Sequence, residues 1–184
     1  MKPITGIAVI CCLALCSVTN GQNTIIKMSD MPYDTITNLI TYKEVVQQKS
    51  TSDELYTRAI EWIGATYKNA ERVTSKRDRT NGVIEGIARF KINYTDKDGL
   101  KNDGGNISYT LLIECKEGRF RYTFNGFNLD IQSRFPVEKW LNKKDVAYNS
   151  NWEKYLKDID TFMKGLITSL KKAMKPPVKI DDTW

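Results

Sequence analysis

Apolar and polar residues alternate most clearly between Ile107 and Phe127, where two strands are predicted to meet at a turn around Glu117-Gly118. Side chains of a strand point alternately to opposite faces, so a single register sorts both strands. The predicted cross-strand pairs are Lys116–Arg119, Cys115–Phe120, Glu114–Arg121, Ile113–Tyr122 and Leu111–Phe124. The apolar face of this hairpin is predicted to form the core, because a one-residue slip would place its aromatic residues in water.

Two segments have the apolar spacing of amphipathic helices. The first begins at Thr51-Ser52-Asp53-Glu54 and extends to about Tyr67. The second spans 150–175, begins at Ser150-Asn151-Trp152-Glu153 and ends before Pro176-Pro177. Both openings match a capping box, in which a Ser or Thr hydroxyl and a Glu carboxylate bond each other's backbone amides. We expect both helices to pack on one apolar sheet face.

Three further strands are predicted at 36–46, 71–77 and 83–94, and Gly86 is expected to mark a bulge. The Asp-, Asn- and Gly-rich stretch 95–106 is expected to be an exposed loop. The order strand, helix, four strands, helix, with short turns, predicts an α+β fold with a single mainly antiparallel sheet. Its domain would span 36–175, preceded by a leader at 22–35 and followed by a disordered tail at 176–184.

The N-terminal pattern is typical of a secretory signal peptide at 1–21, with Lys2 before an apolar run and cleavage expected before Gln22. That run is shorter than the roughly 20 residues of a membrane span, so we expect no transmembrane segment after cleavage. The predicted location is periplasmic or secreted. An alternative is a lipoprotein signal with acylation at Cys16, although Leu15 is larger than that site usually accepts.

Composition excludes several chemistries. The chain has no histidine, which excludes Ser-His-Asp and Cys-His catalysis. Cys115 is the one cysteine outside the predicted signal, and its inward position predicts a buried, unreactive thiol. The acidic stretch containing Asp96, Asp98 and Asp103 lacks the residue order of a calcium loop. We therefore expect a non-enzymatic domain without cofactor or metal.

A basic outer sheet face is the candidate binding site. The net charge is +6, and the predicted registers place Arg89, Lys91, Arg119 and Arg121 on that face. Cross-strand ion pairs on a solvated face are the simpler interpretation. Under the binding hypothesis the partner is an envelope protein or an anionic glycan. A nucleic acid is not the expected partner, because the protein is predicted to be exported. An alternative hypothesis is self-association in the cell envelope through the apolar stripe of the C-terminal helix.

The run from Tyr42 to Leu129 resembles an exported domain-of-unknown-function family of Bacteroidetes described as having a TBP-like fold. The matching stretches are KEVV, TSDELYTRAIEWI, GIARFKINY and YTLLIECKEGRFRYTFNGF. The resemblance covers about half of the chain and implies the TBP-like arrangement of sheet and helices. It implies no catalytic residues, and the fold name does not imply DNA binding.

Overall fold

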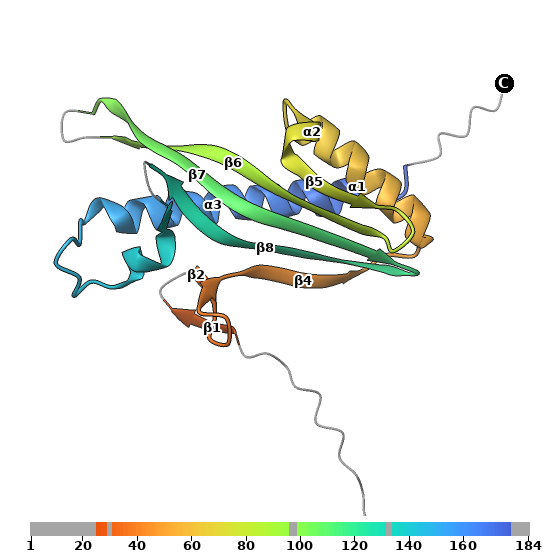
Figure 1. The fold of residues 1–184 in the computed structure, drawn as a ribbon, viewed down its shortest axis with the longest axis horizontal. Helices are drawn as coiled ribbons and strands as arrows, with labels where there is room; N and C mark the ends of the chain where they lie inside the picture. The colour runs from red at the N-terminus through yellow and green to blue at the C-terminus, as the bar shows by residue number, and fades with distance from the viewer. Residues whose placement is uncertain (1–24, 29–30, 96–98, 132–133, 178–184) are drawn as a thin grey trace, which may run out of the picture.

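A six-stranded sheet covered on one face by two helices forms the body of the molecule (Figure 1). The computed structural model describes residues 25–28, 31–95, 99–131 and 134–177. Five strands lie in the order β4 (Tyr42–Gln47), β8 (Arg119–Asp130), β7 (Lys101–Lys116), β6 (Val83–Thr95) and β5 (Thr74–Asp78), and β9 (Arg134–Pro136) pairs with β8. Every described pairing is antiparallel, which confirms the predicted α+β fold class.

The central hairpin has the predicted register. All five predicted cross-strand pairs between β7 and β8 are present. Side chains of the apolar face, from Tyr109 to Phe124, are at most 3% exposed. The turn residue Gly118 has φ 72°, whereas Glu117 is not among the residues with positive φ, so the turn is not type I′. The face assignment follows from the alternation of residues, since only one register buries all of these aromatic rings.

The predicted loop at 95–106 was wrong, because the β6–β7 ladder continues through most of it. Thr95 pairs with Lys101, and a register shift follows Ile92. The glycines in this stretch serve close packing and a bulge: a Cβ on Gly104 would lie 3.0 Å from the Ile92 side chain, and Gly105 has φ 95°. The long hairpin extends beyond the other strands at the left of Figure 1.

The N-terminal region departs from the predicted leader and from the predicted strand at 36–46. A small three-stranded sheet forms from β1 (Ile25–Met28), β2 (Met31–Asp34) and β3 (Leu39–Ile40). The Asp34 carboxylate accepts a hydrogen bond from the Ile36 amide (2.9 Å), so the chain turns where the strand was expected. Met31 and Ile40 are buried, and the core therefore includes residues before 36.

The first helix, α1 (Ser52–Thr66), begins at the predicted capping box. The Glu54 amide donates to the Thr51 hydroxyl (3.2 Å), and the Thr51 amide donates to the Glu54 carboxylate (2.9 Å). The strand predicted at 71–77 begins later than expected. Residues Ala70–Val73 form the short helix α2, whose first turn is capped by the Asn69 side chain, and β5 follows it.

The second of the two predicted helices corresponds to α3 (Asn151–Ala173), which follows the short 3-10 helix η1 (Val137–Leu141). Its predicted capping box was wrong. The Ser150 side chain makes no capping bond, and Glu153 instead accepts from Lys143 and from the Tyr148 hydroxyl. The predicted apolar stripe packs as core: Leu156, Ile159, Met163, Leu166, Leu170 and Met174 are buried. None of the described helices is long and apolar enough to cross a membrane.

Polar contacts near its C-terminal half help to hold α3 to the rest of the fold. The Trp62 indole N–H of α1 donates to the Ser169 hydroxyl (3.1 Å), which places both helices on the same sheet face. The Lys171 ammonium bonds both oxygens of Glu44 on β4 (2.6 and 2.8 Å), and the Tyr122 hydroxyl also donates to Glu44 (2.7 Å). The predicted signal peptide at 1–21, with Cys16, and most of the predicted tail lie outside the described residues.

Candidate functional site

The face of the sheet opposite the helices carries the candidate site. The ladder and the burial pattern place all four predicted binding residues there. The same face carries Lys43, Val45 and Gln47 of β4, Glu85 and Ile87 of β6, Thr110, Leu112, Glu114 and Lys116 of β7, and Thr123 of β8. Most of these side chains are polar, as a solvated antiparallel sheet face requires.

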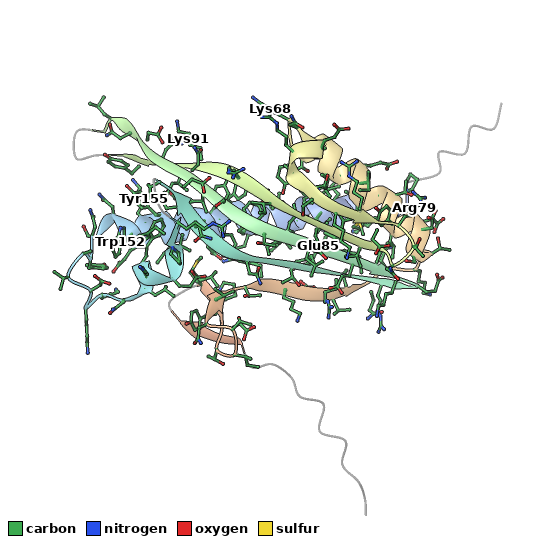
Figure 2. The ribbon with its side chains drawn as sticks, viewed as in Figure 1. Lys68, Arg79, Glu85, Lys91, Trp152 and Tyr155 are labelled. Carbon is green, nitrogen blue, oxygen red and sulfur yellow. The ribbon has the colours of Figure 1, made fainter. Side chains whose placement is uncertain are left out.

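Arg89 and Lys91 lie in one half of this face, and each has an acidic partner. The Arg89 guanidinium pairs with Asp130 (2.8 Å), and the Lys91 ammonium pairs with Asp103 (2.7 Å). Figure 2 shows Lys91 toward the left end of β6 and Glu85 toward the right. Arg89 is paired with Ser108 on β7. Ser108 precedes Glu114 by six residues on that strand, which at roughly 3.4 Å per residue separates the two positions by about 20 Å. The predicted four residues therefore lie in two separate groups.

Arg121 lies in the other half and is held by Glu114 on the neighbouring strand. Two guanidinium nitrogens bond the two carboxylate oxygens, at 2.5 and 2.6 Å. This bidentate hydrogen bond lowers the pKa of Glu114 below its ordinary value, and nearby Lys116 and Lys43 add to the effect. The pair holds the planar guanidinium of Arg121 in one orientation on the outer face of the sheet.

Three cations beside this pair, Lys43, Lys116 and Arg119, have no directly bonded acidic partner in the described part of the chain, although Lys43 and Lys116 lie near enough to Glu114 to lower its pKa. Across the described ranges, no hydrogen bond or ion pair involves the side chains of Lys43, Lys116 or Arg119. Lys116 and Arg119 are directly opposite each other in the ladder, an arrangement that destabilises a sheet when both residues carry the same charge. We call Lys43, Lys116, Arg119 and Arg121 the hairpin-end patch.

A pocket of about 250 Å³ opens within the hairpin-end patch. Lys116, Arg119 and Arg121 line it, together with Glu114, Val45 and Phe120. Val45 is 49% exposed, so a partner bound here would meet an apolar contact beside the cations. The pocket has room for a small anionic group such as a carboxylate, sulfate or phosphate, which the exposed Arg119 guanidinium could bind with two parallel hydrogen bonds.

Other reactive groups are buried or absent from this region. Burial raises the pKa of the Cys115 thiol to about 12, and its side chain is 1% exposed on the inner face. Within the described ranges, no three His, Cys, Asp or Glu residues gather as metal ligands. The arrangement at the hairpin-end patch therefore favours anion binding over covalent chemistry.

Lys43 and Lys116 were missed as site residues in the sequence. The turn position alone places Lys116 opposite Arg119, so the hairpin register contained that signal. Lys43 is brought to the patch by the pairing of β4 with β8, which joins segments far apart in the chain. No local pattern indicates that pairing.

Residues 42–130 match a family model described as a domain of unknown function (DUF4468) with TBP-like fold. Two crystal structures have a similar fold. A DUF4468 family protein from Bacteroides ovatus is 14% identical with a TM-score of 0.60, over 77% of this chain and 90% of that one. A TBP-like protein from Parabacteroides distasonis is also 14% identical, with a TM-score of 0.59 over 74% and 92% of the two chains. No curated protein matches this chain.

Proposed function

Since residues 42–130 belong to the DUF4468 family with its TBP-like fold, which carries no assigned activity, we propose that this protein is an exported, non-enzymatic binding module. Its ligand is an anionic glycan, bound at the hairpin-end patch. The observation that carries the proposal is a pocket on the open sheet face lined by Lys116 and Arg119, whose side chains make no hydrogen bond or ion pair among the described residues.

Charge arrangement supports this choice among the predicted binding residues. Arg89 and Lys91 are neutralised by Asp130 and Asp103, whereas Arg119 has no such partner in the ranges that the structure describes. An anion between Lys116 and Arg119 would relieve their mutual repulsion, so its binding would also stabilise the hairpin. The proposal therefore assigns binding to the hairpin-end patch and a structural role to Arg89 and Lys91.

A repeating anionic polymer fits this surface better than a single small anion. The pocket is small and open, and one exposed charge contact in water is weak. A glycan chain can place one carboxylate or sulfate in the pocket while neighbouring groups meet Lys43. The exposed Val45 side chain offers contact to the apolar face of a sugar ring.

The direct test is titration of the purified protein with two defined glycans, polygalacturonate and dextran sulfate, followed by calorimetry. Reversing one charge with Arg119→Glu is expected to weaken binding about tenfold or more, because it removes a charge-assisted hydrogen bond and adds repulsion. Binding is also expected to weaken as salt is raised. Circular dichroism confirms that the variant is folded.

Lys68→Glu is the matched control, because it makes the same change in net charge at an exposed lysine that Figure 2 shows beyond α1, away from the sheet face. It is expected to bind like the wild type. Equal weakening in both variants, or no binding of either glycan, contradicts the proposal. Duplex DNA is a third ligand, and tighter binding to it than to both glycans would replace the glycan assignment.

A further inference from the structure

A second, larger cavity lies on the other side of the molecule, between α3, η1 and β2. Its volume is about 900 Å³, within the range of about 300–1,000 Å³ of small-molecule sites. Trp140 and Leu141 contribute from η1, Met31 from β2, and one side of α3 forms the opposite wall. We call this cavity the α3–η1 groove. Trp152, labelled in Figure 2 at the same end of α3, stacks on Trp140 with ring centroids 6.1 Å apart.

The groove has an apolar wall made of buried side chains. Met31 and Trp140 are each 2% exposed, and Leu156 is 6% exposed. These side chains line the groove while belonging to the core, so the wall is held rigidly by packing behind it. A thioether, an indole and a leucine side chain suit a flexible aliphatic group, since methionine adapts to irregular apolar shapes.

The polar wall comes from α3, and its buried carboxylate already has partners. Asp160 is 8% exposed and accepts a hydrogen bond from the Tyr42 hydroxyl (3.0 Å) and one from Lys164 (2.5 Å). Glu153, the other acid of the groove, accepts from Lys143 and from Tyr148. Both carboxylates are thus satisfied within the protein, so they do not create a demand for a bound cation.

Lys157 remains as a cation for a ligand. Its side chain is exposed, lines the groove, and makes no ion pair with any residue in the described part of the chain. Lys154 lies one turn before it on the same helix face and Thr161 one turn after it, and both line the groove. Lys164 follows two turns after Lys157. The polar wall is therefore a row of lysines with net positive charge above an apolar wall.

We propose that the α3–η1 groove binds a monomeric amphipathic anion, with an aliphatic tail against Trp140, Met31 and Leu156 and a phosphate or carboxylate head at Lys157. The combination of walls selects both parts of such a ligand. A purely apolar molecule offers no anionic group to Lys157, and an inorganic anion makes no contact with the apolar lining. This site is independent of the hairpin-end patch and involves none of its residues.

The probe for this test is n-octyl phosphate, kept below the concentration at which it forms micelles. Binding is followed by calorimetry and by tryptophan fluorescence, since Trp140 and Trp152 adjoin the groove. Saturable binding of n-octyl phosphate is expected, whereas inorganic phosphate and octanol, which each supply one half of the ligand, are expected to bind more weakly by about tenfold or more. Vesicles of an anionic phospholipid form a separate arm.

Two variants test the two halves of the groove. Lys157→Glu is expected to weaken binding of n-octyl phosphate about tenfold or more, by loss of a charge-assisted hydrogen bond. Thr161→Trp places an indole at an exposed lining position and is expected to block the groove. Lys172→Glu is the matched control, since it makes the same charge change on the same helix outside the groove and is expected to bind like the wild type.

Affinity that is unchanged in both Lys157→Glu and Thr161→Trp, or an absence of n-octyl phosphate binding, overturns this assignment. Loss of binding in Arg119→Glu with normal binding in Lys157→Glu moves the ligand to the hairpin-end patch and also overturns it. Vesicle binding without binding of the monomer would contradict the proposed monomeric ligand. Failure of Arg119→Glu to affect glycan binding leaves the groove unaffected, so the two proposals fail separately.

Discussion

Gly86 on β6 is a position where a single added methyl group is expected to destabilise the fold for a purely steric reason. Its φ lies outside the left-handed region, so alanine could adopt the backbone without strain. The obstacle is steric, because a Cβ at Gly86 would lie 2.1 Å from the carbonyl oxygen of Val73, where ordinary contact begins at 3.4 Å. The chain entering β5 would have to move by about 1.3 Å.

Overpacking of this kind costs about 2–3 kcal/mol when the neighbour is backbone that cannot rotate away. Gly86→Ala is therefore expected to lower the free energy of unfolding by that amount. For a chain of this size the melting temperature would fall by about 4–12 °C. Urea unfolding followed by circular dichroism measures the first quantity, and thermal unfolding measures the second.

The same chemical change at Gly64 is the matched control. Gly64 lies exposed in α1, and apart from its chain neighbours and the backbone of its own helix no atom lies within 4 Å of the place that an added methyl group would occupy. Alanine there should therefore stabilise the helix by about 0.5–1 kcal/mol. Opposite signs at the two sites are the expected result. A Gly86→Ala protein as stable as the wild type would refute the close approach of Val73, at the end of α2, to Gly86.

Three further predictions concern a helix cap, a pH dependence and a thiol. Thr51→Ala should lower stability by about 1 kcal/mol in urea unfolding, because Thr51 caps α1; Ser150→Ala removes no capping bond and should change it by much less. The folded-state pKa of Glu114 is lowered, so its stabilising effect is present above the ordinary value of 4.5 and is lost as the pH falls through the folded value. Glu114→Gln should therefore be less stable than the wild type at pH 7, and a difference that persists undiminished at pH 2 to 3, at roughly the acid limit of carboxylate titration, would contradict this. The Cys115 thiol should resist a disulfide reagent at pH 8 in the folded protein and react once denaturant exposes it; rapid reaction in the native state would show that the inner face opens.

The parts of the fold that could be predicted from sequence are those governed by local alternation or local capping. The register of the β7–β8 hairpin follows from burying Phe120 and Phe124 on one side. The start of α1 follows from Thr51 and Glu54. In both cases neighbouring residues determine the structure, so the pattern needs no knowledge of distant segments.

The errors arose where distant contacts override local composition. The glycines at 104 and 105 indicated a loop, but pairing with β6 draws that stretch into a strand. Ser150 matched a capping box, yet Glu153 bonds Lys143 and Tyr148 instead. The hairpin-end patch was half predicted for the same reason, since Arg119 belongs to the hairpin whereas Lys43 arrives from β4.

The bond between Lys171 and Glu44 joins residues 127 positions apart in the chain. This bond joins α3 to β4, the first strand of the main sheet in chain order. The apolar face of the sheet can therefore be fully buried only after the residues of α3 have been synthesised. The domain is therefore expected to complete its packing as one unit only once α3 has emerged from the ribosome. The helix that closes the core thus also determines when a nascent chain can become a folded domain.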